Sequence, residues 1–244
     1  MPSETEKPAV REVETPHTPQ PVVGVLGSVP YTSLITNAGG GFSRYGNLAV
    51  TRWRHDSTRD NYGQFCYVKD LSTGQVWSTA YHPSCTEPQW YRVLFASDRV
   101  TFIRRDGEID TVTEIAVASD DAAEVKRVTL TNRSLQPREI ELTSYSEIVL
   151  TTPDADRGHP AFHNLFVQTE WLAANAALLA TRRPRSATEA SIWCAHVAAC
   201  GPELVGSITC ETDRSKFVGR GRSVRNPLAL DEGAELSGTV GAVL

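Results

Sequence analysis

Apolar and polar side chains alternate along residues 109–117, 126–132 and 139–145. In the first of these segments Ile115 falls on one face and Glu114 on the other. A period of two residues is the pattern of a β-strand with one buried face and one solvated face. The alternation therefore predicts half-buried strands and is incompatible with amphipathic helices over these segments.

Turn residues separate the predicted strands. An Asp-Gly pair at 106–107 is typical of a tight hairpin, and Ser, Thr, Asp, Gly or Pro gather at 72–74, 120–121 and 134–137. No helical period lies between these turns. Short strands at close spacing predict an all-β fold, in which antiparallel sheets stack as a sandwich.

Size and charge limit the classes of function. The 244 residues suffice for one large β domain or two small ones, and hydrophobic residues (40%) and charged residues (22%) occur at ordinary levels for a globular chain. The net charge of −5 argues against broad nucleic-acid binding, which favours a basic footprint. No apolar run approaches the roughly 20 residues that span a bilayer, and no signal-peptide pattern opens the chain.

The five cysteines are odd in number and irregularly spaced, and no C-x-x-C occurs. This pattern predicts neither a disulfide framework nor a zinc site. Reduced, buried cysteines are expected in a cytosolic compartment, so we expect a cytoplasmic protein. Membrane association would have to come from other parts of a longer parent protein.

Composition suggests where the folded part begins and ends. Residues 1–21 are rich in Glu, Pro and Thr, which predicts a disordered tail or linker. We expect the β-sandwich domain over residues 22–244. Residues 236–244 have the pattern of a strand that ends abruptly on Val-Leu, so we expect a domain truncated at its C-terminus.

One segment leaves two alternatives open. Residues 169–181 contain five Ala and three Leu, a composition that suits a helix by intrinsic propensity. The same residues could form two strands joined at Ala174 and Asn175. Propensity alone does not decide between them.

The block from Asn37 to Asp70 is the strongest functional signal. Three glycines at 39–41 lack the Lys and the helix of a phosphate loop. They predict either a plain turn or a loop in which positive φ allows close approach to a ligand or another backbone. A strand with Arg52, Trp53 and Arg54 follows, and alternation would place the two Arg on one face. Rings that stack on C–H groups and Arg that donate to hydroxyls suit a sugar surface.

From this block we take Arg44, Tyr45, Arg52, Arg54 and Asp56 as candidates to face a carbohydrate or a partner domain. Further aromatic residues cluster in the first third of the chain, and one or two of them could form a stacking platform. The structural alternative buries Trp53 in the core and leaves the Arg residues solvated or paired with nearby carboxylates such as Asp56 and Asp60.

Other candidate chemistry is weak. His159 and His163 have helical metal-ligand spacing, but Pro160 interrupts it and no third ligand is evident. Nothing in the sequence indicates that the carboxylate pairs Glu139 and Glu141 or Asp154 and Asp156 are shielded from solvent, as a glycosidase pair would be. The G-x-S-x-G motif of a serine nucleophile is absent from the sequence. We therefore predict no catalytic residue, no metal site and no cofactor.

The chain resembles the N-terminal β-sandwich (supersandwich) region of glycoside hydrolase family 94, formerly glycosyltransferase family 36, and is most similar to that region of cyclic β-1,2-glucan synthases. The likeness runs from about Tyr31 to the last residue. The matching stretches are ITNAG at 35–39, SRY at 43–45, AVTRWR at 49–54 with D56 and TRD at 58–60, G63 with Y67 and D70, VWS at 76–78, EIAV at 114–117, RVTLTN at 127–132, REIELTSY at 138–145, HPAF at 159–162, NLF at 164–166, ETDR at 211–214, GRGR at 219–222 and NP at 226–227.

The resemblance implies a large antiparallel, galactose-mutarotase-like sandwich, and it favours two strands over residues 169–181. It also implies that the catalytic acid and the phosphate site lie in a helical (α/α)6 barrel after the sandwich. In the family the sandwich packs on that barrel, shapes the active-site entrance and contributes to dimer contacts. The implied partners are therefore a β-glucan or oligosaccharide, the barrel, and a second copy in a homodimer.

One departure from the family pattern is Pro30, which removes a backbone donor and should weaken the pairing of the strand it precedes.

Two rival functions follow from the residues. The sandwich could be only a scaffold for the barrel, without sugar contact. It could also be a small, self-sufficient enzyme that uses His159 or His163 as an acid or base.

Overall fold

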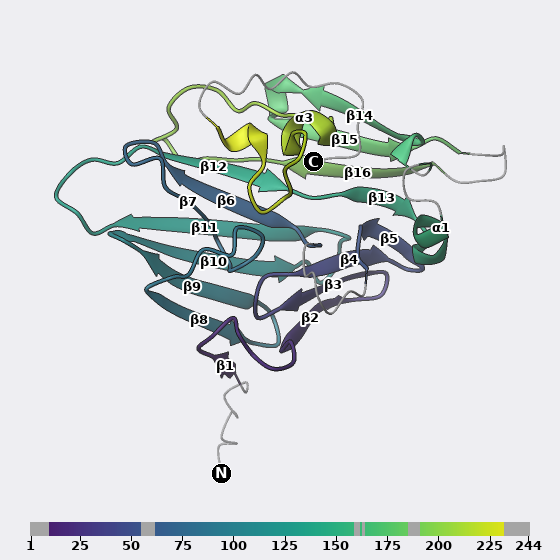
Figure 1. The fold of residues 1–244 in the computed structure, drawn as a ribbon. Helices are drawn as coiled ribbons and strands as arrows, with labels where there is room; N and C mark the ends of the chain where they lie inside the picture. Colours follow the sequence, from purple (N-terminus) through teal and green to yellow (C-terminus); the bar gives the residue numbers. More distant parts are fainter. Residues whose placement is uncertain (1–9, 55–61, 159–161, 163, 185–190, 232–244) are drawn as a thin grey trace, which may run out of the picture.

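The computed structural model describes residues 10–54, 62–158, 162, 164–184 and 191–231 (Figure 1). Within them the chain is built almost entirely of strands. These are β1 Arg11–Val13, β2 Val23–Ser28, β3 Tyr31–Thr36, β4 Gly41–Tyr45, β5 Leu48–Thr51, β6 Phe65–Asp70, β7 Val76–Ser78, β8 Trp90–Phe95, β9 Val100–Asp106, β10 Ile109–Val117, β11 Glu124–Asn132, β12 Ile140–Tyr145, β13 Ile148–Thr151, β14 Val167–Leu172, β15 Ala177–Arg182 and β16 Ile192–Val197.

Short helical turns connect or follow the strands. They are α1 Pro153–Gly158, η1 Ala173–Asn175, α3 Arg214–Val218 and η2 Leu228–Leu230. None of the described helices is both long and apolar enough to cross a membrane.

The strands form four antiparallel sheets. Their orders are β1-β8-β9-β10-β11, β12-β6-β7, β13-β5-β4-β3-β2 and β14-β15-β16. Figure 1 shows strands β8–β11 of the first sheet in teal beside the purple strands β2–β5, with the green strands β14–β16 above them. The predicted all-β sandwich class is thereby confirmed.

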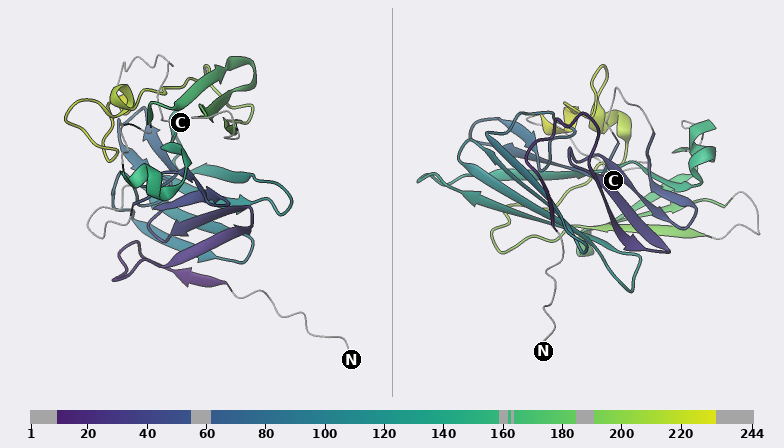
Figure 2. Two further views of the ribbon diagram at one scale, coloured as in Figure 1. Left: turned by 90° about the vertical axis from the view of Figure 1, so that its right-hand side faces the viewer. Right: turned by 90° about the horizontal axis from the view of Figure 1, so that it is seen from below.

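The alternation in the sequence sets the register of the first sheet. β9 and β10 form a hairpin that pairs Asp106 with Ile109, as the Asp-Gly signal predicts, and β10 then pairs with β11 from Ile109 to Val117. Along β10 the buried residues alternate with half-buried ones. The buried face contributes to a core shared with β2 and β3, and the right-hand view in Figure 2 shows these two groups of strands together.

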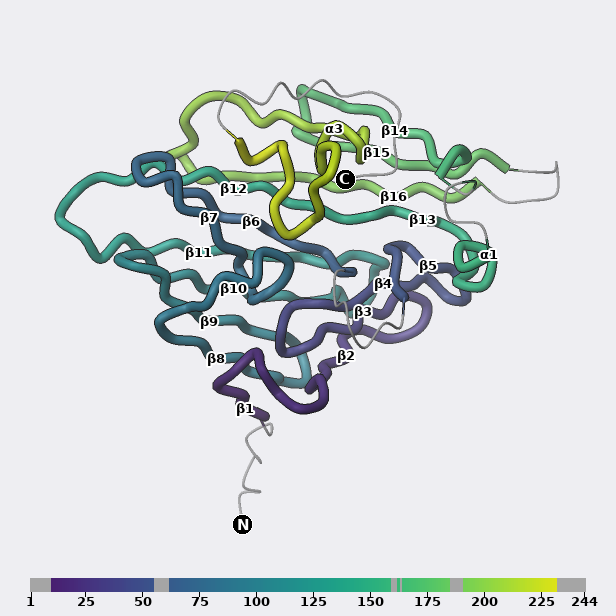
Figure 3. Tube along the Cα trace, in the orientation of Figure 1, coloured from purple at the N-terminus to yellow at the C-terminus, as the bar shows by residue number. Residues whose placement is uncertain are grey.

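Three further apolar clusters join the other sheets. Val68 and Trp77 of the β12-β6-β7 sheet pack on Ile109 of β10. The other face of that sheet is covered by the C-terminal segment, which inserts Phe217 and Leu230 against its aromatic residues. The tube in Figure 3 shows this yellow segment crossing the strands β6 and β12. The β14–β16 sheet packs on β5 and β13 through a cluster that includes Val50, Ile148, Leu150, Val167, Leu178 and Ala180.

The expected tail over residues 1–21 needs a correction in its described part. β1 pairs with β8 at the edge of the first sheet. Behind it, the Asn37 side chain donates to the carbonyls of Thr15 and Pro16 and accepts from the Val22 amide. Long-range hydrogen bonds thus order part of this segment, although its low content of apolar side chains predicted a disordered tail.

Two local questions are decided by context. Residues 169–181 form β14, the turn η1 and β15, so the strand alternative at Ala174 and Asn175 is correct and the helix alternative is wrong. Pro30 does not weaken a strand, because it lies in the turn between Ser28 and Tyr31, where no ladder donor is needed.

The central core makes a first prediction. Phe102 of β9 is 1% exposed, and Phe102→Ala should lower the free energy of unfolding by about 3–5 kcal/mol, since it removes buried apolar contacts and leaves a cavity. Urea denaturation measures this change. The control is Val125→Ala on β11, where the side chain is 63% exposed and the cost should stay within about 0.5 kcal/mol. Equal costs for both variants would contradict this placement of the core.

Candidate functional site

The predicted aromatic and cationic block forms a partly exposed surface on β4 and the segment after β5. Alternation along β4 places Phe42 and Arg44 on one face and the buried Ser43 on the other. The Arg44 guanidinium lies 4.6 Å from the Phe42 ring centroid, and the Trp53 ring lies 5.3 Å from it at an interplanar angle of 54°. Trp53 is 36% exposed. We call these three side chains the Phe42–Arg44–Trp53 surface.

Polar contacts behind β4 hold this surface in place. The Ser43 hydroxyl donates to Glu124 of β11 at 3.0 Å, and the Gln64 side chain donates to Ser43 at 2.7 Å. Thr51 accepts from the Ser43 amide at 2.9 Å. β4 is thus connected through its inner face to the opposing sheet, which limits movement of the rings on its outer face.

The remaining candidates lie in different environments. Tyr45 ends β4 opposite Leu48 and is 45% exposed. Arg54 is partly buried, and its Nε is enclosed without a hydrogen-bond partner in the described part of the chain. Asp56 and Asp60 lie outside the described residues, as do His159 and His163.

Arg52 is not placed as strand alternation predicts. β5 ends at Thr51, so residues 52–54 lie beyond the strand, and Arg52 is 7% exposed. Its guanidinium donates to Glu147 at 2.6 Å, to both oxygens of Asp156 at 2.8 and 3.0 Å, and to Asn164 at 2.6 Å. These contacts engage four of the five N–H donors of the guanidinium, so the buried cation is held mainly by groups of the protein itself.

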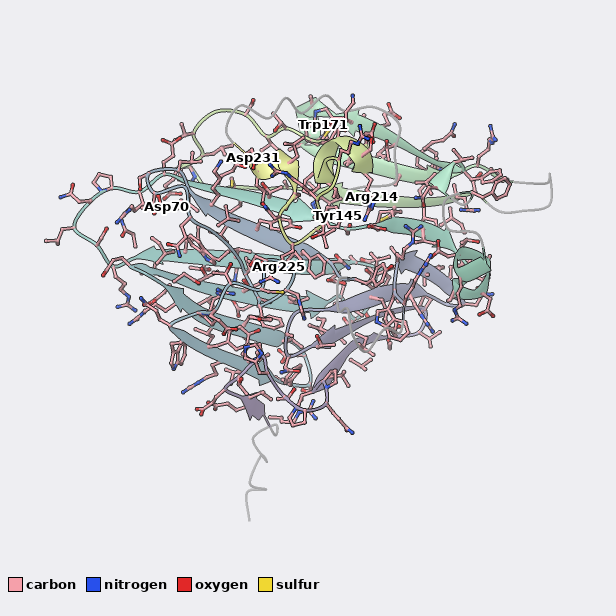
Figure 4. The ribbon with its side chains drawn as sticks, in the orientation of Figure 1. Asp70, Tyr145, Trp171, Arg214, Arg225 and Asp231 are labelled. Carbon is pink, nitrogen blue, oxygen red and sulfur yellow. The ribbon has the colours of Figure 1, made fainter. Side chains whose placement is uncertain are left out.

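Glu147 is the centre of this buried group. Its second oxygen accepts from Arg214 at 2.7 Å and from the Tyr145 hydroxyl at 2.8 Å. Figure 4 labels Tyr145 of β12 and Arg214 of α3, which lie close together, as their shared contact with Glu147 requires. Burial alone would raise the pKa of Glu147, but the guanidinium groups of Arg214 and Arg52 and the hydrogen bonds outweigh it, so the pKa is lowered. We call Arg52, Tyr145, Glu147, Asp156 and Arg214 the Arg52 ion cluster.

The Arg52 ion cluster joins parts of the fold that are distant in sequence. Two cations face two carboxylates, so their formal charges balance. The groups come from the end of β5, the turn between β12 and β13, α1 and α3. Removing Arg52 would leave Glu147 and Asp156 buried without its charge, and removing the carboxylates would leave Arg52 buried and unpaired, both of which are costly; Arg214 is half-exposed. The Arg52 ion cluster therefore stabilises the fold. It influences the Phe42–Arg44–Trp53 surface only because it fixes the position of residues 52–54, which include Trp53.

The glycine loop serves backbone packing. Gly41 has φ 149°, and a Cβ there would lie 1.9 Å from the Leu34 carbonyl oxygen. Gly39 has φ 93°, and a Cβ there would lie 2.3 Å from the Ala80 side chain. The prediction of positive φ and close approach is confirmed, and the approaching groups are protein atoms.

A pocket of about 530 Å³ was not evident from the sequence. It is lined by Lys69, Gly74, Val76, Ser84, Thr86, Ser223, Arg225, Asn226, Leu230 and Asp231. These residues come from β6 and β7, the turn before β8 and the C-terminal segment, and no local motif marks them. In the described residues no group of three or more His, Cys, Asp or Glu side chains is placed to bind a metal.

Comparisons with known proteins agree with the architecture. The family model for the glycosyl hydrolase 94 supersandwich domain matches residues 6–244. The chain is 34% identical to cyclic beta-(1,2)-glucan synthase NdvB of Rhizobium meliloti (strain 1021), over 98% of this chain and 8% of that protein. It is 30% identical to 3-O-beta-D-glucopyranosyl-beta-D-glucuronide phosphorylase of Paenibacillus borealis, over 55% of this chain and 17% of that protein.

A third relative is N,N'-diacetylchitobiose phosphorylase of Vibrio proteolyticus, which is 23% identical over 91% of this chain and 27% of its own length. The chain thus spans between 8% and 28% of the length of the curated relatives that it matches.

The Arg52 ion cluster makes a stability prediction. Arg52→Met should lower the free energy of unfolding by about 3–5 kcal/mol, because Glu147 and Asp156 would stay buried without their cation. The control Arg44→Met removes a cation from the surface, where no ion pair with a described residue is present, and should cost less than about 1 kcal/mol. Chemical denaturation of both variants compares the costs. An Arg52 variant as stable as the control would show that the cluster is not structural.

A second prediction concerns pH. The lowered folded-state pKa of Glu147 means that this group contributes stability at pH values above the ordinary 4.5 and loses that contribution as the pH falls through the folded-state value. Glu147→Gln should therefore flatten the fall in the free energy of unfolding below pH 4.5. The exposed Glu139→Gln variant should keep the wild-type slope. The same slope in Glu147→Gln as in the wild type would contradict the role given to the cluster.

Proposed function

Because this chain belongs to the glycosyl hydrolase 94 supersandwich family, we propose that it is the carbohydrate-binding and supporting sandwich domain of a β-glucan phosphorylase or a cyclic β-1,2-glucan synthase. It spans a small share of each relative, so the proposal places the chemistry in another domain of a longer enzyme. The partner proposed for the sandwich is the (α/α)6 barrel that the family resemblance implies.

The Phe42–Arg44–Trp53 surface is the observation that supports sugar contact. Two aromatic rings neighbour each other here, with Trp53 exposed and Phe42 half-buried, and a cation lies over the Phe42 ring. A pyranose ring has an apolar C–H face and a rim of hydroxyls, so it can stack on the indole or phenyl ring while Arg44 donates to a hydroxyl. Tyr45, at the end of the same strand, offers a further ring and hydroxyl.

The polarity of this surface suits a neutral glucan. Arg44 supplies several donors without a carboxylate partner among the described residues, and the rings supply contact area at low entropic cost. The Arg52 ion cluster would then hold the Phe42–Arg44–Trp53 surface in position from the interior of the protein. Arg54, which follows Trp53 in the chain, would lie at the border of this surface.

A scaffold without sugar contact is the second candidate. One observation in its favour is that Arg52 is bound to Glu147 and Asp156 within the protein and does not face a ligand. Another is that apolar side chains such as Val25, Trp193 and Val197 are exposed, and a larger domain could cover them. In that case the Phe42–Arg44–Trp53 surface would contact the barrel of the parent enzyme.

Titration of the 244-residue chain with β-1,2-linked glucooligosaccharides separates these functions. Trp53→Ala should weaken saccharide affinity by about fivefold to tenfold, a loss that corresponds to roughly 1 kcal/mol of stacking. The matched control is Trp90→Ala on β8, where Arg92 also lies over an exposed indole, at 5.1 Å. That variant should bind as the wild type does.

Calorimetry gives the affinities, and far-UV circular dichroism checks that each variant is folded. No saturable binding by the wild type would favour the scaffold. Equal loss in both tryptophan variants would place sugar contact elsewhere than on β4.

A further inference from the structure

The pocket beside the C-terminal segment is lined by polar side chains, of which Lys69 and Arg225 are held in place by hydrogen bonds to the backbone. Residues 223–231 lie over the β12-β6-β7 sheet, where Val224 and Leu230 enter the aromatic core. Two side chains of β6 fix this segment: the Tyr67 hydroxyl donates to the Val224 carbonyl, and Lys69 Nζ donates to the Leu230 carbonyl at 2.7 Å. The pocket is therefore bounded by a strand on one side and by a pinned loop on the other.

Lys69 is an unusual residue for a pocket wall. It is 6% exposed, so its ammonium group has lost nearly all contact with bulk water. An ammonium group has three donors, and among the described residues the carbonyl of Leu230 is its hydrogen-bond acceptor. A buried cation with spare donors is costly unless a second acceptor is supplied.

Arg225 supplies a second cation to the same pocket. Its Nε donates to the Ser84 carbonyl at 3.2 Å, which fixes the plane of the guanidinium. Its terminal nitrogens make no hydrogen bond with the described residues and form a planar pair of donors.

The carboxylates nearby are already engaged. Asp231 accepts from both terminal nitrogens of Arg222, at 2.9 and 2.7 Å, and Asp70 pairs with Arg138 at 3.1 Å. Figure 4 labels Asp70, Arg225 and Asp231 around this region. Asp231 also lines the pocket, and its hydrogen bonds from Arg222 and, after them, the nearby Lys69 ammonium lower the pKa of that carboxyl. Because Arg222 pairs with Asp231, Lys69 and Arg225 together still leave a local excess of positive charge with unused donors.

We propose that this pocket binds the phosphate group of a small organic phosphate. Paired N–H donors and a desolvated ammonium match the several acceptor oxygens and the charge of a phosphate. A volume of about 530 Å³ exceeds the space that a bare phosphate fills and lies in the range of small-molecule sites. The Ser223 hydroxyl and the Asn226 amide could contact the organic part. This site is separate from the Phe42–Arg44–Trp53 surface and does not rest on the proposed function.

Three probes test the proposal by calorimetry at constant ionic strength: inorganic phosphate, glucose 6-phosphate and glucose. We expect saturable binding of glucose 6-phosphate, weaker binding of phosphate and none of glucose. Arg225→Gln should weaken glucose 6-phosphate binding by about tenfold, as the loss of a charge-assisted hydrogen bond would. Lys69→Gln should weaken it at least as much. The matched control is Arg220→Gln, an exposed arginine of the same segment that does not line the pocket.

If Lys69→Gln does not fold, the exposed Arg225 and Arg220 pair decides the result. Absence of saturable binding of either phosphate compound would overturn the proposal. Equal weakening in the Arg225 and Arg220 variants would overturn it too, because it would reveal attraction to general surface charge. Loss of phosphate binding with unchanged glucan binding distinguishes this site from the surface on β4.

Discussion

The burial of the Glu147 carboxylate is the constraint on which much of the structure depends. A desolvated carboxylate must be met by cations, and Arg52 and Arg214 meet it from opposite ends of the sequence. Holding Arg214 in place fixes the start of α3, and α3 then brings Phe217 against Tyr145, with ring centroids 4.9 Å apart. The C-terminal segment that follows forms one wall of the phosphate pocket. A single ionic contact therefore organises both a core and a concave surface.

Local pattern predicted the strands well where one face is buried. β10 and β11 follow directly from alternation, and the turn between β9 and β10 follows from its Asp-Gly pair. Pattern failed where two conformations have similar local energies. Alanine and leucine in residues 169–181 suit a helix, but packing on β5 and β13 rewards an extended chain, and Ala176 adopts φ 47° to complete the turn. Tertiary contacts decided between states that propensity could not separate.

The residue types of the candidate site could be recognised in the sequence. The contacts that those residues make in the fold could not be predicted from it. The sequence shows that Arg52 is a cation near aromatic rings, and a sugar surface is a natural hypothesis for it. Its partners lie 95, 104 and 112 positions away, in elements whose meeting depends on the whole fold. The phosphate pocket and the hydrogen bonds of Asn37 to Thr15 and Pro16 could not be predicted for the same reason, because they join residues that are far apart in the sequence. Phe42 and Arg44 were accessible to sequence reasoning because two positions on one strand necessarily share a face.

The pairing of β1 with β8 makes residues 11–13 part of the first sheet. A version that starts at Val22 would keep the predicted sandwich but would lose β1. The backbone groups at residues 93–95 of β8 that face β1 would then lack partners, while the pairing of β8 with β9 would remain. Asn37 would lose the two carbonyls that its amide group now satisfies. In evolutionary terms, residues 11–13 cannot drift as a free linker can, because their backbone forms the edge strand of the sheet. Recombination that joins this sandwich to a new upstream partner should therefore break the chain before β1.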